Sequence, residues 1–308
     1  MDDLPVPKGL QFLSPHSGRI VRLTIVVRTH QALDTILTSF RNVAMPSLEN
    51  LDIESHRDID LLDMSPLNSP NITSLKMTRC TPAFPPPQWM VALTHLHLKN
   101  NPYPVRENSD IFRFMTTQLP SLIYLYLDLT KGAFGSGNGI VYQSLAHVEL
   151  VFHESETNAL FNQLASFDTP HLTHLSLHHI HGDQDCHCEA VADFGDDYRP
   201  ITTPPRLFPV ISSLTLIREC FTPRIVSDLL GPGSQPWPQL EVLALRPMAA
   251  DVENLYKALQ EVVCCKRSQQ ESLPTFKLSP NLFEREFWAE NGVVVELLEE
   301  PSIIGSGV

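Results

Sequence analysis

The sequence has few cysteines, few basic residues and no long apolar run. Its 308 residues include six cysteines whose spacing matches no disulfide framework, so we expect free thiols in a reducing compartment. Lys and Arg total 22 against 35 Asp and Glu, a formal net charge of −13, which argues against binding of nucleic acids or anionic membranes. No stretch approaches the ~18 consecutive apolar residues of a membrane span, and the N-terminus does not have the pattern of a secretory signal. We therefore expect a cytoplasmic or nuclear protein.

Motifs for catalysis and phosphate binding are also lacking. None of the patterns G-x-S-x-G, H-E-x-x-H, G-x-x-x-x-G-K-[ST] or G-x-G-x-x-G occurs. The glycine-rich run at 131–141 precedes a strand-like segment, whereas phosphates bind at helix N-termini. We expect no enzyme activity and no cofactor.

A leucine pattern recurs along most of the chain. It reads L-x-x-L-x-L, often with a proline two residues before the first leucine. The copies lie at 17–25, 45–53, 69–77, 90–98, 119–127, 142–150, 169–177, 208–216 and 237–245, with a weaker one at 273–281. From Ile20 to Leu273, nine intervals span 253 residues, a mean of about 28, and leucine-rich repeats have periods of roughly 20–29 residues.

The pattern predicts the local structure of each repeat. The L-x-L unit alternates as a half-buried strand does, with the leucines pointing inward. Between these units, apolar residues at i, i+3 and i+4 spacing predict helices at 31–40, 109–119, 155–167, 222–231 and 251–266. The turn position of the consensus matches only at Cys80 and Asn101, so we expect no continuous asparagine ladder.

These elements predict an α/β fold, a leucine-rich-repeat solenoid in which a curved parallel sheet carries helices on its convex side. We expect one repeat domain over 20–300, after a short lead-in at 1–19 and before a tail at 301–308. An acidic loop that contains His and Cys is inserted at about 179–206. The segment 291–300 is expected to form a last strand that covers the open end of the solenoid.

The residues beside and between the last two leucines of each copy are expected to face the concave side. Histidines and tyrosines gather there in the middle repeats, where neighbouring strands would lie about 4.8 Å apart. We predict a partner-binding patch of His95, His97, Tyr124, Tyr126, His147, Glu149, His174 and His178. Exposed Tyr and His suit a protein-binding hot spot, and protonation of His at about pH 6.5 would change the affinity. The alternative is that T-H-L is a tolerated surface sequence with no partner.

The insertion allows a different interpretation. Residues 178–188 contain His, Asp and Cys, which are zinc-type ligands, but the C-x-C spacing has no second pair to complete a site. We expect a solvated acidic loop and no metal. A metal-binding protein or metal-dependent enzyme that uses the 178–188 cluster is the alternative from another functional class.

The repeat phrases also carry a family resemblance. PSLENLDI, SPNITSLKM, LPSLIYLYL, TPHLTHLSL and WPQLEVLAL, with the opening LSPHSGRIVRLTIVV, resemble the leucine-rich-repeat region of fungal, basidiomycete-type F-box-like proteins over roughly residues 10–300. In that family an F-box docks on the adaptor of a cullin ubiquitin ligase, and the repeats select the target. About 19 residues precede the first repeat here, so we expect the F-box to be missing, and adaptor binding is not expected without it.

The resemblance implies a non-catalytic protein–protein interaction module, similar to the substrate-recognition repeats of a ubiquitin-ligase subunit. A repeat-only scaffold with no role in ubiquitin ligation is the alternative. In both cases we expect an unidentified protein partner and no contact with nucleic acids or membranes.

Overall fold

The computed structural model describes residues 14–67, 69–83, 87–101, 119–129, 140–141, 143–153, 167–180, 210–217, 226, 230, 237–247, 252–283 and 286–298. The chain divides into two compact units, Met1–Thr169 and Pro170–Val308.

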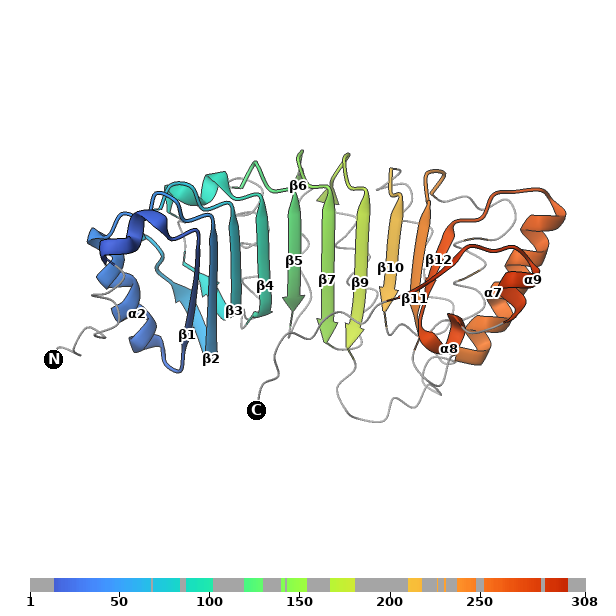
Figure 1. The fold of residues 1–308 in the computed structure, drawn as a ribbon, viewed down its shortest axis with the longest axis horizontal. Helices are drawn as coiled ribbons and strands as arrows, with labels where there is room; N and C mark the ends of the chain where they lie inside the picture. The colour runs from blue at the N-terminus through green and yellow to red at the C-terminus, as the bar shows by residue number, and fades with distance from the viewer. Residues whose placement is uncertain are drawn as a thin grey trace. The chain divides into compact units, whose positions relative to one another are not determined.

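Each described copy of the leucine pattern contributes one strand to a parallel sheet (Figure 1). In the first unit these are β1 (Arg22–Val27), β2 (Asn50–Leu62), β3 (Ser74–Pro82), β4 (His95–Asn101), β5 (Tyr124–Leu129) and β7 (His147–His153). In the second they are β9 (His174–Ile180), β10 (Ser213–Ile217), β11 (Val242–Arg246) and β12 (Thr275–Leu278), followed by β13 (Val295–Leu297). The eleven strands form one open sheet in chain order. The predicted α/β fold with a parallel sheet of repeats is confirmed.

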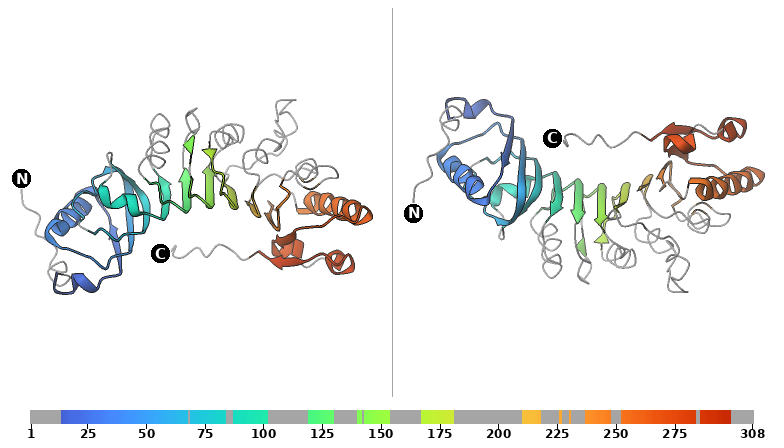
Figure 2. Two further views of the ribbon diagram at one scale, coloured as in Figure 1. Left: turned by 90° about the horizontal axis from the view of Figure 1, so that it is seen from above. Right: turned by 90° about the horizontal axis from the view of Figure 1, so that it is seen from below.

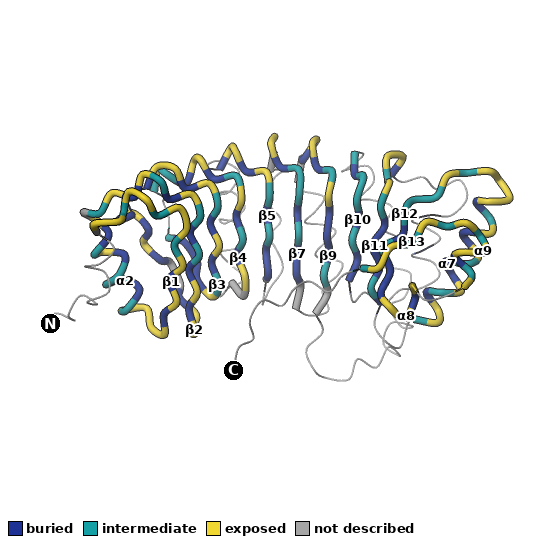
Figure 3. The backbone as a smooth tube through the Cα atoms, viewed as in Figure 1, coloured by how far each residue is buried: buried dark blue, intermediate teal, exposed yellow. Residues whose placement is uncertain are grey.

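The core follows from the alternation of leucines. In register across β2, β3, β4, β5 and β7, one buried row contains Leu51, Leu75, Leu96, Leu125 and Val148, and the next contains Ile53, Met77, Leu98, Leu127 and Leu150. Figure 3 shows buried positions alternating with more exposed ones along β4. Burial of each such side chain contributes roughly 1.5–3 kcal/mol, so these rows bind the repeats of the first unit together.

The proline of the motif forms a turn that leads into the strand. The Leu48 N–H donates to the Met45 carbonyl over 3.1 Å, which closes a four-residue turn with Pro46 in its second position. Proline fixes the backbone angle that this turn position requires. Equivalent bonds join Leu93 to Met90, Leu122 to Leu119 and Leu240 to Trp237.

Backbone hydrogen bonds then fix the register between repeats. The Thr94 carbonyl accepts from two successive N–H groups of the next repeat, Ile123 at 2.8 Å and Tyr124 at 3.0 Å. The same two-to-one pairing recurs at the carbonyls of Val21, Glu49, Thr73, Ile123, Thr173 and Ser212. This ladder lies at the start of the strands, at the opposite end from the consensus asparagine position.

At the end of β3 the alternation breaks. Arg79 has a φ of 57°, in the left-handed region that non-glycine residues rarely adopt, and its Nη1 donates to the His56 carbonyl over 2.9 Å. Cys80, which matches the consensus turn position, is fully buried. Burial raises the pKa of its thiol to about 12, so the thiol stays protonated and acts as a small apolar side chain.

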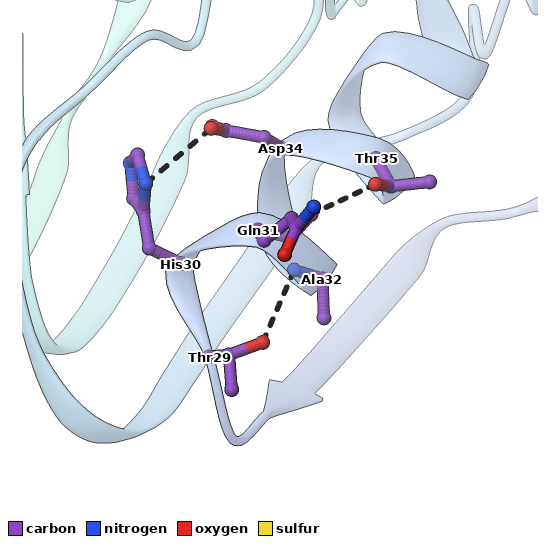
Figure 4. A network of polar contacts seen from close by, with 6 residues as sticks. All are labelled: Thr29, His30, Gln31, Ala32, Asp34 and Thr35. Carbon is purple, nitrogen blue, oxygen red and sulfur yellow. Dashed lines mark hydrogen bonds and ion pairs between the residues drawn. The ribbon is translucent and has the colours of Figure 1, made fainter. Parts of the chain in front are cut away.

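The helix expected at 31–40 is α2 (His30–Ser39), which packs against β1 and β2 (Figure 2). Its N-terminus is capped by Thr29, whose Oγ1 accepts from the Ala32 N–H at 3.3 Å (Figure 4). One helical turn along α2, Asp34 Oδ2 lies 3.4 Å from His30 Nδ1. Leu33 and Leu37 are buried, and the 3-10 turn η2 (Phe40–Asn42) follows. Two more 3-10 turns, η1 (Ser14–Arg19) and η3 (Gln88–Ala92), precede β1 and β4.

The second unit contains the helix expected at 251–266, observed as α7 (Val252–Ser268). Lys266 is buried on it and pairs with Glu271 at 2.8 Å. Two short helices, α8 (Pro280–Phe283) and α9 (Glu286–Glu290), precede β13. β13 pairs in parallel with β12 at the end of the sheet, which confirms the last strand predicted within 291–300. With three residues it is a very short edge strand, which limits edge-to-edge pairing.

Several other expectations fall outside the described residues. Most of the helices predicted at 109–119, 155–167 and 222–231 lie there, as does nearly all of the insertion at 179–206. Leu119 is described, and it is buried but not helical. Val226 and Leu230 are described, and both are helical and buried. Phe167 instead belongs to β8 (Phe167–Asp168), which pairs with β6 (Ile140–Val141) in a separate two-stranded sheet.

We predict that Leu125→Ala lowers the free energy of unfolding by about 2–5 kcal/mol, because it leaves a cavity in a packed row. Ile123→Ala is the matched control, since Ile123 lies two residues earlier and is 44% exposed; it should cost much less. Urea unfolding of both variants measures the difference. Equal losses would contradict the assignment of Leu125 to the core.

Candidate functional site

Six of the eight predicted patch residues lie together on the exposed face of β4, β5 and β7. Across these strands, His95, Tyr124 and His147 are in register, and so are His97, Tyr126 and Glu149. The alternation that turns the leucines inward turns these residues outward. We call these six side chains the aromatic surface. The two rows continue toward β1 with polar residues such as Ser74, Lys76 and Asp52.

The rings of the aromatic surface stack on one another. His97 and Tyr126 have centroids 3.8 Å apart and an interplanar angle of 7°. His95 stacks on Tyr124 at 5.8 Å, and His147 meets the same tyrosine edge-on at 4.8 Å. Adjacent parallel strands are separated by about 4.8 Å, so rings in register reach this contact without distortion. Such pairs contribute about 0.5–1.5 kcal/mol each beyond the burial of area.

A diagonal hydrogen bond connects the two rows. The Tyr124 hydroxyl donates to Glu149 Oε2 over 3.1 Å. Burial raises the pKa of Glu149, and the bond from Tyr124 only partly offsets this. Burial is also the main reason that the pKa values of Tyr124 and Tyr126 are raised, with the neighbouring carboxylates adding to it. Both phenols therefore stay protonated and keep their donor groups.

His97 corrects one expectation from the sequence. Its pKa is lowered to about 4, chiefly by burial and further by the positive charges of Lys76 and Lys99, against a smaller opposing effect of Asp128. The prediction that the patch histidines titrate at about pH 6.5 is therefore wrong for this residue, which is neutral at pH 7. Its Nε2 is buried and has no hydrogen-bond partner. Stacking on Tyr126 thus holds an uncharged ring.

A threonine orients His95. Thr94 Oγ1 donates to the Thr73 carbonyl over 3.1 Å and lies 2.9 Å from His95 Nδ1. When the hydroxyl gives its one proton to the carbonyl, Nδ1 is the donor in the second bond. In neutral His95 this leaves Nε2 as an acceptor for a partner. The threonine of T-H-L therefore positions the histidine, a role that sequence reasoning missed.

His174 and His178 lie in the second unit, on β9. In register with them on β10 are Ser213 and Ile217. Thr173 Oγ1 lies 2.9 Å from His174 Nδ1, which repeats the arrangement at His95. Ser176 Oγ lies 2.8 Å from His178 Nε2. The eight predicted residues are thus found as a set of six in the first unit and a pair in the second.

The structure adds Asp128 to the candidate site. This residue is 2% exposed and lies two positions after Tyr126 on β5. Its charge acts on both rings of the stacked pair. It raises the pKa of Tyr126, and it partly opposes the lowering of the pKa of His97. The alternation Y-L-Y-L-D places it on the same face as the tyrosines, so the signal was present in the sequence.

The described residues contain no group of three or more His, Cys, Asp or Glu side chains arranged to hold a metal ion. Most of the 178–188 cluster lies outside them, since the described part ends at Ile180 and resumes at residue 210. Within the same part of the chain, no helix is long and apolar enough to cross a membrane.

No family model matches the chain, and no curated protein is similar to it at a significant level. The resemblance to F-box-like proteins thus rests on the repeat phrases alone.

We predict that the His97→Phe variant, which keeps a ring against Tyr126, loses less stability in acid than the wild type. The unfolded chain takes up a proton on His97 near pH 6.5, whereas the folded chain resists protonation to about pH 4. The wild-type free energy of unfolding should therefore fall relative to that of the variant between these pH values, by at most about 3 kcal/mol. Urea unfolding at pH 7, 5 and 4 measures this, and parallel pH curves would contradict it.

We predict that Glu149→Gln is at least as stable as the wild type at pH 7. A carboxyl whose folded pKa is raised destabilises the fold above that pKa, and this cost vanishes below the ordinary value of 4.5. The amide oxygen of Gln can still accept from Tyr124. The difference in unfolding free energy should therefore disappear near pH 4. A variant less stable at pH 7 would mean that the charged hydrogen bond outweighs the cost of burial.

Proposed function

We propose that the chain is a non-catalytic protein–protein interaction module, and that the aromatic surface binds its partner. The supporting observation is the stacked, in-register array of His and Tyr rings on one face of an open parallel sheet. The repeat phrases that resemble F-box-like proteins favour a role in selecting the substrate of a ubiquitin ligase. The proposal places the protein in the cytoplasm or nucleus.

The physical properties of the aromatic surface suit a protein partner. Its rings already contact one another, so binding would cost little additional side-chain entropy. Tyr124 and Tyr126 combine apolar area with a hydroxyl, as hot-spot residues do. Charged residues such as Lys76 and Lys99 flank His97, which resembles the polar rim around the centre of an interface.

The neutral state of three of these rings at pH 7 also suits an interface with a protein. A buried charge at the centre of an interface has to be desolvated, and this costs binding energy unless it is paired. His97, Tyr124 and Tyr126 are all uncharged at pH 7, because burial opposes their charged forms. These three rings can therefore be covered without removing an ion from water.

We predict that Tyr124→Ala combined with Tyr126→Ala removes a bound protein. The wild-type chain and the double variant are used to purify partners from cells of the source organism, and the recovered proteins are quantified by mass spectrometry. At least one protein should be lost more than about 30-fold, as expected when hot-spot residues worth about 2 kcal/mol or more are removed.

The matched control is Val26→Ala, because Val26 is 55% exposed on β1 and in register with Glu54 of the exposed face. It should retain the same protein. If the double variant folds and every wild-type partner survives in it, the aromatic surface is not the binding site.

The link to ubiquitin is measured on the partner identified in this way. If the chain recruits the partner to a ligase, deletion of the gene should lower the ubiquitination of that partner. Unchanged ubiquitination, with binding retained, would favour the repeat-only scaffold instead.

A further inference from the structure

A groove of about 790 Å³ lies among the segments that lead into β3, β4 and β5. Two of its described lining residues, Leu67 and Ser69, are buried. Three others, Pro70, Val91 and Ser121, are exposed. The groove is therefore open to solvent and reaches the core. Its volume falls within the roughly 300–1,000 Å³ of ligand-binding pockets.

The small side chain of Ser69 accounts for space at this place. Three residues before the first apolar residue of their copies, Met45, Met90 and Leu119 have large, buried side chains. Ser69 occupies this position in the third copy and is equally buried, at 1% exposure. A serine fills much less volume than the methionines of the two adjoining copies, so the packing is incomplete beside it.

Two polar atoms of the lining residues have no hydrogen-bond partner. They are Ser69 Oγ and Trp89 Nε1, and both are buried. An indole N–H can only donate, and a hydroxyl has one proton to donate. A buried donor without an acceptor is unfavourable. A ligand that brings oxygen acceptors into the groove would therefore relieve this cost.

The lining of the groove selects a neutral ligand. None of its described residues is Asp, Glu, Lys, Arg or His, although the chain has 35 acidic and 22 basic residues. Apart from serines and Gln88, the described lining consists of prolines, Trp89 and aliphatic side chains. An ion would lose hydration there without gaining an opposite charge. The occupant should be uncharged, largely apolar and rich in hydrogen-bond acceptors.

The groove spans three consecutive repeats. Pro70, Val91 and Ser121 come from the segments before β3, β4 and β5, which are neighbours in the sheet. Two strand spacings cover about 9.6 Å. A polyproline II helix has three residues per turn and rises about 3.1 Å per residue, so one turn covers about 9.3 Å. Successive turns of such a helix would meet equivalent positions two repeats apart.

We propose that this groove binds a proline-rich segment of a partner protein in the polyproline II conformation. Prolines are uncharged and lack an N–H, so their carbonyls are free to accept from the donors of Trp89 and Ser69. Such a segment is extended before it binds, and aromatic-lined grooves recognise it at little cost in entropy. The inference goes beyond the proposed function, because the groove and the aromatic surface share no residue.

Titration of the full chain with a labelled peptide of ten prolines tests the chemistry of the ligand. Fluorescence anisotropy should show that it binds at least 10-fold more tightly than a ten-residue Gly-Ser peptide with the same label. Equal affinities, or no binding, would overturn the inference. Chitotriose, a neutral sugar that can also stack on an indole, is titrated by calorimetry. Binding of the sugar without binding of oligoproline would assign the groove to a carbohydrate and overturn the inference.

Two variants then locate the binding site. Ser69→Met gives the third copy the methionine of its neighbours, so it should lower the affinity for oligoproline at least 10-fold while the melting temperature stays equal or rises. Trp89→Phe keeps a ring and removes the N–H donor, and it should lower the affinity about 3- to 10-fold, as expected for one lost hydrogen bond. Wild-type affinity in both folded variants would overturn the inference.

The matched control is Tyr124→Ala combined with Tyr126→Ala, which removes rings from the aromatic surface and leaves the groove unchanged. Its affinity for oligoproline should stay within 2-fold of the wild type. Loss of binding in this double variant, with wild-type affinity in Ser69→Met, would place the peptide on the aromatic surface and overturn the inference. Failure of the proposed function is recognised separately, by retention of every cellular partner in the same double variant.

Discussion

At the start of seven described strands, one backbone carbonyl accepts hydrogen bonds from two successive N–H groups of the next repeat. The rest of the structure depends on the register that this pairing fixes. A shift by one residue would exchange the two faces of a strand. In β5 it would bring Tyr124 and Tyr126 into the core and expose Leu125. The same bonds therefore set the buried rows and the aromatic surface.

This constraint is independent of the length of the connections. Ile72 and Leu93 are 21 residues apart, and Leu93 and Leu122 are 29 apart, yet His95 and Tyr124 are in register. The turn before each strand and the carbonyl ladder restore the alignment after each connection. Insertions between repeats can thus be accommodated without disturbing contacts on the sheet.

The sequence predicted the features that depend on periodicity. Alternating leucines identified the strands, spacing at i, i+3 and i+4 identified α2 and α7, and the period of two placed His95, Tyr124 and Glu149 on one face. Features that depend on neighbours from other repeats were not predicted. They include the lowered pKa of His97, to which Lys76 of the preceding repeat contributes, and the bond from the Thr94 hydroxyl to the Thr73 carbonyl of that repeat, beside which His95 lies.

The leucines lie on the buried face of the sheet and the residues between them lie on the exposed face, so the exposed residues can change independently of the core. On the exposed face of the first unit, each residue has a fixed place that is set by its strand and by its register with the neighbouring strands. A substitution at one such place alters contacts with the residues on the adjoining strands but leaves the buried rows of leucines intact. The exposed face can therefore change one residue at a time without disturbing the buried rows, so that two chains with the same core can present unrelated surfaces.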